Sequence, residues 1–227
     1  MKNLIAMIAL ISSIAQAAPM DGVNLTTLSK PADVKYQVYN YKPVMKGVLY
    51  RGGSTTTTPT GQMAPLLKQS TDVLCADGFD AVVYAYTKGW TGGDRVVDCG
   101  SNKMSYVQRS WDNPAQVHDV LKNLRDIIVE GKGAMYVHCY YGVHASGYLA
   151  TVALMQFCGL AGQDAINYWD SNVAPTIRYP KVHDMINAFK PDPNLSITPD
   201  QAARVCPTAV DYQTVTEELK KHPTPQK

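Results

Sequence analysis

The residues best suited to chemistry lie around Cys139, in the stretch GAMYVHCYYGVHASGYLATVALMQFCG, residues 133–159. A short apolar segment ending at His138 predicts a strand, five residues form a loop, and Ala145 and Ser146 begin a long apolar segment that predicts a helix to about residue 157. Cysteine attacks as a thiolate, which helix N-terminal amides and a neighbouring histidine stabilise. The same amides bind phosphate oxygens. The stretch therefore predicts a thiolate inside an oxyanion-binding loop.

The segment VHCYYGVHAS resembles the signature loop of the cysteine-dependent phosphatases, the tyrosine and dual-specificity superfamily. Their pattern is His-Cys, two residues, Gly, two residues, Arg, then Ser or Thr, and His138, Cys139, Gly142 and Ser146 match it. The resemblance implies that Cys139 forms a phosphocysteine intermediate, that Ser146 helps the sulfur leave, and that the backbone holds the phosphate. The cradle then consists of Tyr140, Tyr141, Gly142, Val143, His144, Ala145 and Ser146.

The resemblance also implies a general acid, and Asp112 in SWDNPAQV stands 27 residues before Cys139. Its place just before a predicted helix suits protonation of a leaving alkoxide. The competing interpretation is that Asp112 caps this helix. Trp111 is expected to form a wall or hinge of the site. Tyr140 and Tyr141 either line the mouth of the pocket or pack in the core.

Ala145 departs from the pattern, because the family has arginine there and no lysine or arginine occurs in residues 133–177. Removing one such donor costs on the order of 3–4 kcal/mol, roughly a hundredfold to a thousandfold in rate. His144 is one candidate substitute, if it is protonated beside a dianion. Arg51 and Lys88 are others, and Arg178 is a weaker one, although the favoured interpretation of Arg51 and Lys88 is a solvated surface charge.

Two further explanations of Ala145 stay open: a pseudophosphatase that binds a phosphorylated or anionic ligand with little turnover, and an engineered substitution. The joint presence of His138, Cys139, Ser146 and Asp112 favours a working phosphomonoesterase, which needs no metal or organic cofactor. A rhodanese, a cysteine protease, a serine hydrolase and a zinc site fit the spacing less well. The resemblance includes exported bacterial inositol polyphosphate phosphatases (phytases), so the expected substrate is an inositol phosphate or a phosphotyrosine-like ester.

The composition favours one soluble globular domain. The chain has 227 residues, of which 45% are hydrophobic and 18% charged, and a net charge of +2 gives no reason to expect nucleic acid as a partner. Lys2, an apolar run from residue 4 to 14 and Ala15-Gln16-Ala17 predict a signal peptide, residues 1–17. We therefore expect export to a periplasm or the exterior, a small phosphorylated ligand as partner, and no membrane contact of the mature chain.

Five cysteines are an odd number for an exported protein, which suggests one free thiol. Cys139 is the candidate for it. Cys75, Cys99, Cys158 and Cys206 can then form up to two disulfides, whose pairing the sequence leaves open. Cys158 lies in the apolar helix and can equally be a buried thiol.

Strand and helix patterns alternate, which predicts an α/β fold with a central, mostly parallel sheet flanked by helices, and the resemblance implies a tyrosine-phosphatase-like arrangement. An irregular N-terminal arm (18–45), a phosphatase-like domain (46–200) and a C-terminal helical segment and tail (201–227) are expected. The predicted strands are 47–51, 80–86, 95–97, 104–109 and 134–138. The predicted helices are 63–74, 114–130, 145–157, 163–169, 181–189 and 209–220.

Overall fold

The computed structural model describes residues 32–33, 35–56, 64–100, 102–172 and 179–208. The predicted signal peptide, Arg178 and the predicted helix 209–220 lie outside these ranges. The strands are β1 Ala32–Asp33, β2 Val38–Tyr39, β3 Lys42–Met45, β4 Leu49–Gly52, β5 Ala81–Tyr84, β6 Arg95–Asp98, β7 Lys103–Gln108 and β8 Met135–His138. The helices are α1 Lys68–Ala76, α2 Pro114–Glu130, α3 Ala145–Cys158, α4 Gly162–Asp170, α5 Pro180–Ala188 and α6 Pro199–Val205, with a 3₁₀ turn at Pro193–Leu195.

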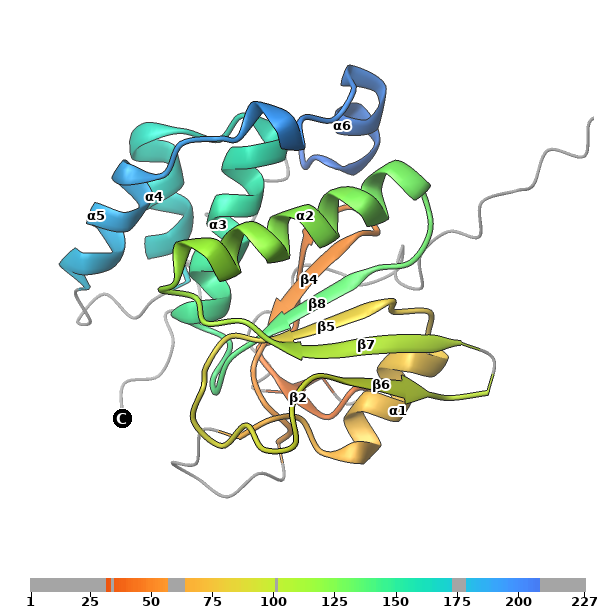
Figure 1. Ribbon diagram of the computed structural model, residues 1–227. Helices are drawn as coiled ribbons and strands as arrows, with labels where there is room; N and C mark the ends of the chain where they lie inside the picture. The colour runs from red at the N-terminus through yellow and green to blue at the C-terminus, as the bar shows by residue number, and fades with distance from the viewer. Residues whose placement is uncertain (1–31, 34, 57–63, 101, 173–178, 209–227) are drawn as a thin grey trace, which may run out of the picture.

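A six-stranded sheet in the order β3-β4-β8-β5-β7-β6 forms the centre of the molecule (Figure 1). The four inner strands are parallel, whereas β3 and β6 pair antiparallel at the two edges. The predicted α/β class with a mostly parallel sheet is therefore confirmed. β8 lies between β4 and β5, so the loop after His138 emerges at the carboxyl edge of the inner strands, where open α/β sheets bind ligands.

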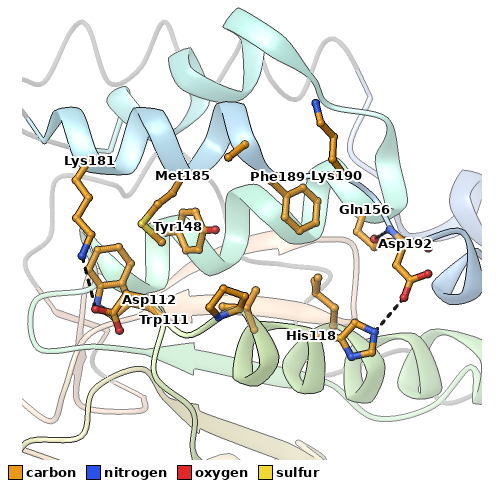
Figure 2. Close-up of a pocket in the computed structure, with 14 residues that line it drawn as sticks. Trp111, Asp112, His118, Tyr148, Gln156, Lys181, Met185, Phe189, Lys190 and Asp192 are labelled. Atoms are coloured by element: carbon orange, nitrogen blue, oxygen red, sulfur yellow. Dashed lines mark hydrogen bonds and ion pairs between the residues drawn. The ribbon is translucent and has the colours of Figure 1, made fainter.

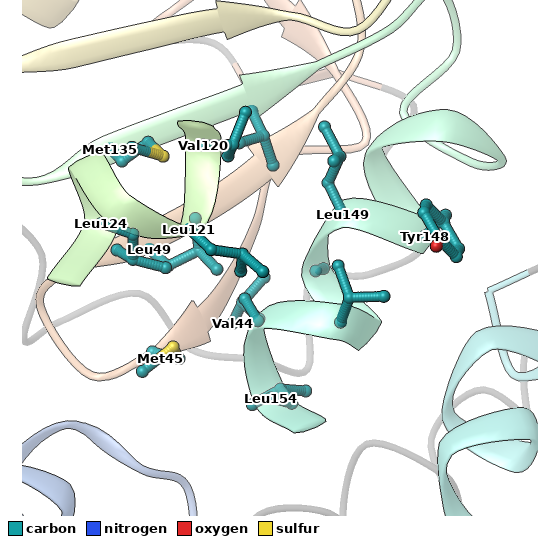
Figure 3. Packing of buried hydrophobic residues seen from close by; sticks show 14 of the residues in the cluster. Val44, Met45, Leu49, Val120, Leu121, Leu124, Met135, Tyr148, Leu149 and Leu154 are labelled. Atoms are coloured by element: carbon teal, nitrogen blue, oxygen red, sulfur yellow. The ribbon is translucent and has the colours of Figure 1, made fainter. Parts of the chain in front are cut away.

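Helices cover the two faces of the sheet unequally. α2 to α6 lie on one face and α1 lies on the other (Figure 1). Figure 3 shows the core of the larger layer, where Leu121 and Leu124 of α2 and Leu149 of α3 pack against Leu49 and Met135 of the sheet. The opposite face buries an aromatic core around Tyr36, Tyr136 and Phe79.

Two helices have the local signals that the sequence predicted. Asn113 caps α2 by accepting hydrogen bonds from two backbone N–H groups, Pro114 occupies the first turn, and Gly131 ends the helix in the left-handed region (φ 70°). α3 has no charged residue, and every residue from 145 to 155 is buried, as the uniform apolar composition predicted. None of the described helices combines the length and apolar composition needed to span a bilayer.

The N-terminal prediction is wrong for residues 38–45, which form β2 and β3 rather than an irregular arm. β3 completes the main sheet by pairing with β4, and Tyr36 and Val38 are fully buried. The first predicted helix begins later, at Lys68 rather than residue 63. The short helix α6 was not predicted, although the sequence has its start signals. Thr198 is the N-cap and forms a capping box with Gln201, and Pro199 occupies the first turn.

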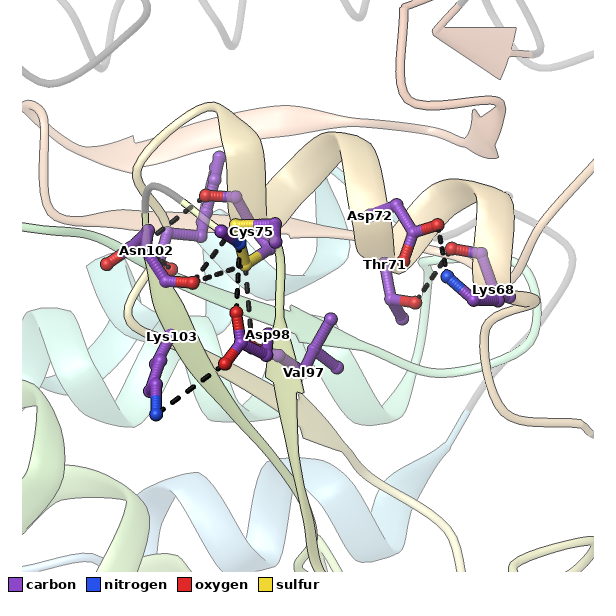
Figure 4. The surroundings of a disulfide bond; sticks show 11 residues. Lys68, Thr71, Asp72, Cys75, Val97, Asp98, Asn102 and Lys103 are labelled. Carbon is purple, nitrogen blue, oxygen red and sulfur yellow. Dashed lines mark hydrogen bonds and ion pairs between the residues drawn. A yellow bond between two sulfur atoms is a disulfide. The ribbon is translucent and has the colours of Figure 1, made fainter.

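Two disulfides connect the four other cysteines and leave Cys139 as the free thiol. Cys75–Cys99 ties α1 to the end of β6, in surroundings shown in Figure 4, where Asn102 donates to the carbonyls of Cys75 and Phe79. Cys158–Cys206 ties the end of α3 to the end of α6. The alternative of a buried thiol at Cys158 is therefore wrong.

Candidate active site

Cys139 follows β8 directly and is 2% exposed. Its sulfur lies 3.5 Å from the hydroxyl oxygen of Ser146 in the first turn of α3. The structure thus brings together the predicted nucleophile and the predicted leaving-group assistant. The short distance arises because the loop between them, residues 140–145, folds back onto the helix N-terminus.

Five carbonyl groups of this loop accept hydrogen bonds from groups outside it. His138 Nδ1 donates to Cys139 O at 3.2 Å. Ser54 N donates to Tyr140 O at 2.7 Å, and Asn40 Nδ2 donates to Tyr141 O at 2.7 Å. Arg51 Nη1 donates to Val143 O at 3.4 Å, and Trp169 Nε1 donates to His144 O at 3.3 Å. None of the described peptide bonds is cis, and in a trans peptide the N–H points opposite to the C=O. The amides that follow the Cys139, Val143 and His144 carbonyls are therefore directed to the inner side of the loop, as an oxyanion cradle requires, whereas the β-bridge between Tyr141 and Gly53 turns one N–H of the Tyr141–Gly142 segment toward the end of β4.

Gly142 is needed for this loop on two grounds. Its φ of 75° lies in the left-handed region. A Cβ there would lie 2.5 Å from the carbonyl carbon of Gly52 and 2.6 Å from the nitrogen of Gly53, at the end of β4. Because these neighbours are backbone atoms, no side chain fits at this position. Gly52 at the end of β4 and Gly53 directly after it let the cradle pack against this strand.

His138 is fully buried, and burial lowers its pKa to about 3, so the ring is neutral at physiological pH. The Cys139 carbonyl oxygen can only accept, so Nδ1, which lies 3.2 Å from it, carries the proton of the neutral ring, and Nε2 accepts from Tyr106 Oη at 2.8 Å. Nδ1 then donates to the Cys139 carbonyl. The expectation that His138 favours the thiolate by its charge is therefore wrong. It orients the first peptide of the cradle instead.

His144 does not supply the missing charge either. Burial lowers its pKa, and Nε2 is buried with no hydrogen-bond partner among the described residues. Its ring packs 4.3 Å from that of Tyr179. The open question about the two loop tyrosines has a mixed answer, because Tyr140 is buried and Tyr141 is 50% exposed beside the loop.

Asp112 lies in the turn before α2, where Ser110 Oγ donates to its carboxylate at 2.7 Å. Asn113 is the N-cap, so the competing interpretation of Asp112 as the cap is wrong. Lys181 of α5 pairs with Asp112 at 3.8 Å, but its side chain is 72% exposed and such a pair is weak in water. Asp112 is therefore not held rigidly in one position.

Backbone hydrogen bonds place the Asp112 turn beside the cradle. Trp111 N donates to Ala85 O at 3.2 Å, and Ala85 N donates to His138 O at 2.9 Å. Tyr86 was not predicted as a site residue, but it lies within electrostatic range of both Cys139 and Asp112. Burial first, and then the charges of Cys139, Tyr179, Tyr84 and Asp112, raise the pKa of Tyr86.

A groove of about 440 Å³ begins at Asp112 and runs between α2, α3 and α5 (Figure 2). Asp112, Trp111 and Lys181 lie at one end, and the ion pair His118–Asp192 lies at the other. The remaining lining is mostly apolar or aromatic: Pro114, Val117, Leu121, Tyr148, Met185, Ala188 and Phe189, with Gln156 and Lys190.

Of the other predicted cations, Lys88 is exposed, as expected of a surface charge, whereas Arg51 is 1% exposed. Lys42, which the sequence did not indicate, stands directly opposite Arg51 on β3. Burial, and then the charge of Arg51, lowers the pKa of Lys42 to about 7. Among the described residues, no group of three or more His, Cys, Asp or Glu side chains is placed to hold a metal ion.

No protein-family model matches the chain, and no curated protein matches its sequence. Among solved structures, the chain is similar to the crystal structure of PTPMT1, with 13% sequence identity and a TM-score of 0.35. The match covers 80% of this chain and 96% of that chain. The functional argument therefore depends on the geometry of the site itself.

Proposed function

We propose that the protein is a cysteine-dependent phosphomonoesterase. The observation that carries the proposal is the set of inward-directed amides that follow Cys139, Val143 and His144, with the Ser146 hydroxyl 3.5 Å from the Cys139 sulfur. Such amides match the charge that develops on the equatorial oxygens during phosphoryl transfer. A buried thiol with a purely structural role has no need of this arrangement.

In the proposed first step, the Cys139 thiolate attacks phosphorus, the S–P bond forms and the bond to the leaving oxygen breaks. Asp112 gives its proton to that oxygen. In the second step, Asp112 accepts a proton from water as the water attacks phosphorus. The S–P bond then breaks, and the Ser146 hydroxyl donates a hydrogen bond to the departing sulfur.

The groove bears on the choice between the two expected substrate types. It begins at Asp112, the proposed acid, although none of residues 139–146 lines it. Its lining is mostly apolar and aromatic, and among the described residues Lys181 and Lys190 are its only lysines or arginines. An inositol hexakisphosphate requires more cations than these. The lining therefore favours a phosphate monoester with an aryl or apolar leaving group over a highly phosphorylated inositol.

A pseudophosphatase is the second candidate, supported by Ala145, which is fully buried and contributes only a methyl group to the cradle. In that case the amides bind an oxyanion in the ground state but stabilise the transition state too little for useful turnover. Both candidates use the same cradle, so binding and turnover must be measured separately.

Phosphate release from an aryl phosphate and from inositol hexakisphosphate tests the proposal, with the parent, Cys139→Ser and Thr151→Val compared. Thr151 is a buried hydroxyl one turn along α3 that bonds to Gly147 O, so it controls for loss of a hydroxyl near the site. We expect release from the aryl ester by the parent and Thr151→Val but not by Cys139→Ser. Stabilisation by inorganic phosphate without release from either ester would support the pseudophosphatase, and faster release from inositol hexakisphosphate would refute the substrate assignment.

We also propose export, on the strength of the signal-peptide pattern of residues 1–17. The full chain expressed in a bacterium with two membranes should be recovered from the periplasm with an N-terminus near Ala18. Recovery of uncleaved chain in the cytoplasm would contradict this.

A further inference from the structure

Arg51 reaches the outer side of the cradle from a neighbouring strand. β4 and β8 are parallel neighbours, and Arg51 lies opposite Val137, two residues before Cys139. Its guanidinium ends at the N-terminus of α3, where Nη1 lies 3.4 Å from the Val143 carbonyl oxygen. A Cβ added at Gly147 would lie 2.8 Å from the same Nη1. The guanidinium thus occupies the space that the glycine of the first helical turn leaves open.

The charge of Arg51 is not neutralised by any carboxylate among the described residues. Within the described part of the chain its only hydrogen bond is the long one to Val143, and Nη2 is buried with no partner there. Burial lowers the pKa of Arg51, but arginine remains protonated in proteins. A buried cation without an anion is strongly unfavourable. The fold therefore retains a positive charge that lacks its counter-charge.

The other ionisable groups around Arg51 add no fixed negative charge. Lys42 lies opposite it on β3, and Tyr168 of α4, Cys139 at the start of the loop and Tyr136 of β8 lie within electrostatic range of it. Burial and the charge of Arg51 lower the pKa of Lys42 to about 7, so Lys42 is partly positive near neutral pH and never negative, and tyrosines are neutral at physiological pH. Of these groups, Cys139 alone becomes an anion in the proposed reaction. An oxyanion in the cradle is the other available counter-charge.

We propose that Arg51 is the cation of the cradle and takes the electrostatic part of the absent loop arginine from a neighbouring strand. This inference rests on the proposed function of the loop. Arg51 holds the Val143–His144 peptide so that its N–H points inward, and its charge stabilises the thiolate and a bound oxyanion from outside the loop. It is a positioning residue, since it acts through this peptide and through the field rather than by gripping the phosphate.

The alternative is that Arg51 only packs the loop. The two explanations differ in what the substitution Arg51→Met changes. Removal of a buried unpaired charge with retention of the side-chain volume leaves stability equal or higher. The proposal requires that Arg51→Met leave the free energy of unfolding equal or higher, because an unpaired buried charge is removed. It also requires that the variant form the Cys139 thiolate less readily, because the sulfur loses its counter-charge.

The test measures the rate of Cys139 alkylation by iodoacetamide across pH, and the affinity for inorganic phosphate, in the parent, Arg51→Met, Gly147→Ala and Thr151→Val. For Arg51→Met we expect alkylation at neutral pH to slow and phosphate affinity to fall, each roughly tenfold. Gly147→Ala displaces the guanidinium with a methyl group in a position that favours helix, and should change both quantities in the same direction by less. Thr151→Val should change neither.

An unchanged alkylation profile and phosphate affinity in Arg51→Met would overturn the proposal. If Arg51→Met does not fold, unchanged values in Gly147→Ala overturn it instead. Neither readout requires turnover. A parent that releases no phosphate, but whose alkylation and phosphate binding depend on Arg51, would therefore refute the enzyme and keep this inference.

Discussion

At the scale of single residues, the Ser146 hydroxyl offers a selective test of the proposed second step. It lies 3.5 Å from the Cys139 sulfur, a distance at which it can donate a hydrogen bond to a departing thiolate. We expect Ser146→Ala to lower kcat roughly tenfold to a hundredfold and to leave the first turnover fast, so that phosphocysteine accumulates. Rapid-quench measurement of the burst checks this, with Thr151→Val as control. A slowed burst would instead place Ser146 in the first step.

Burial of His138 makes stability depend on pH in a defined window. Its pKa is about 3 in the fold and about 6.5 in an unfolded chain, so the unfolded state binds more protons between these values. Its contribution to stability is full above pH 6.5 and is lost as pH falls toward 3, by at most about 1.4 kcal/mol per pH unit.

Urea denaturation of the parent and His138→Asn between pH 7 and pH 4 measures this contribution. The parent's free energy of unfolding should fall more steeply toward pH 4 than that of the variant. His118→Gln is the comparison for loss of a half-exposed histidine, whose ring pairs with Asp192 at the surface, and it should change the slope less than His138→Asn does. Equal slopes in parent and His138→Asn would mean that the buried ring is protonated without penalty.

The sequence predicted the residues of the loop but not their charges. Cys139, Gly142 and Ser146 are fixed by spacing within eight residues, so local pattern sufficed. The neutral state of His138 depends on Tyr106, 32 residues away, and on burial that no local pattern shows. Arg51 was interpreted as a surface charge because its partner, Val143, is 92 residues distant. Side chains alternate along a strand, so Arg51 must point to the same face of the sheet as the apolar Leu49. This alternation was the sequence signal that could have predicted burial of Arg51.

At the scale of elements, the cradle depends on close contact between the loop and the end of β4. Gly142→Ala brings two penalties, a left-handed φ of 75° and a Cβ 2.5 Å from backbone. Gly100→Ala brings only the first, since its φ is 82° and nothing lies within 4 Å of its Cβ. We expect about 1 kcal/mol of destabilisation for Gly100→Ala and about 2–4 kcal/mol for Gly142→Ala.

Urea denaturation of both variants separates the two penalties, and iodoacetamide reactivity of Cys139 reports on the loop. Gly142→Ala should also alter the alkylation rate, because the inner amides move with the loop, whereas Gly100→Ala should not. Equal destabilisation by the two variants would show that the backbone of Gly52 and Gly53 shifts to accommodate the new methyl group at little cost.

Helices were predicted more accurately than the N-terminal strands for a physical reason. The start of α2 is encoded by Asn113 and Pro114, and its end by Gly131, all of which act locally. β2 and β3 contain two and four residues, too few for a period-2 pattern to show. Their stability comes from pairing with β4 and from the aromatic core around Tyr36, contacts that only the folded chain creates.

At the scale of the whole molecule, the two disulfides fix the periphery of opposite layers. Cys75–Cys99 lies on the face of the sheet that α1 covers. Cys158–Cys206 ties α6 to α3 in the layer on the other face. Cys139 lies between these layers at the carboxyl end of the central strand. The oxidised pairs are therefore separated from the thiol that the reaction needs, and neither pair includes a residue of the cradle.

Because the disulfides close loops of different length, their contributions to stability should differ in a calculable way. The paired cysteines are 24 residues apart in one case and 48 in the other. Loop-closure entropy gives about 3–4 kcal/mol for each and about 0.6 kcal/mol more for the longer loop. We expect Cys158→Ser with Cys206→Ser to lower the free energy of unfolding slightly more than Cys75→Ser with Cys99→Ser. Urea denaturation of both double variants checks this order, and a double variant as stable as the parent would show that its bond adds strain equal to the entropy that it removes.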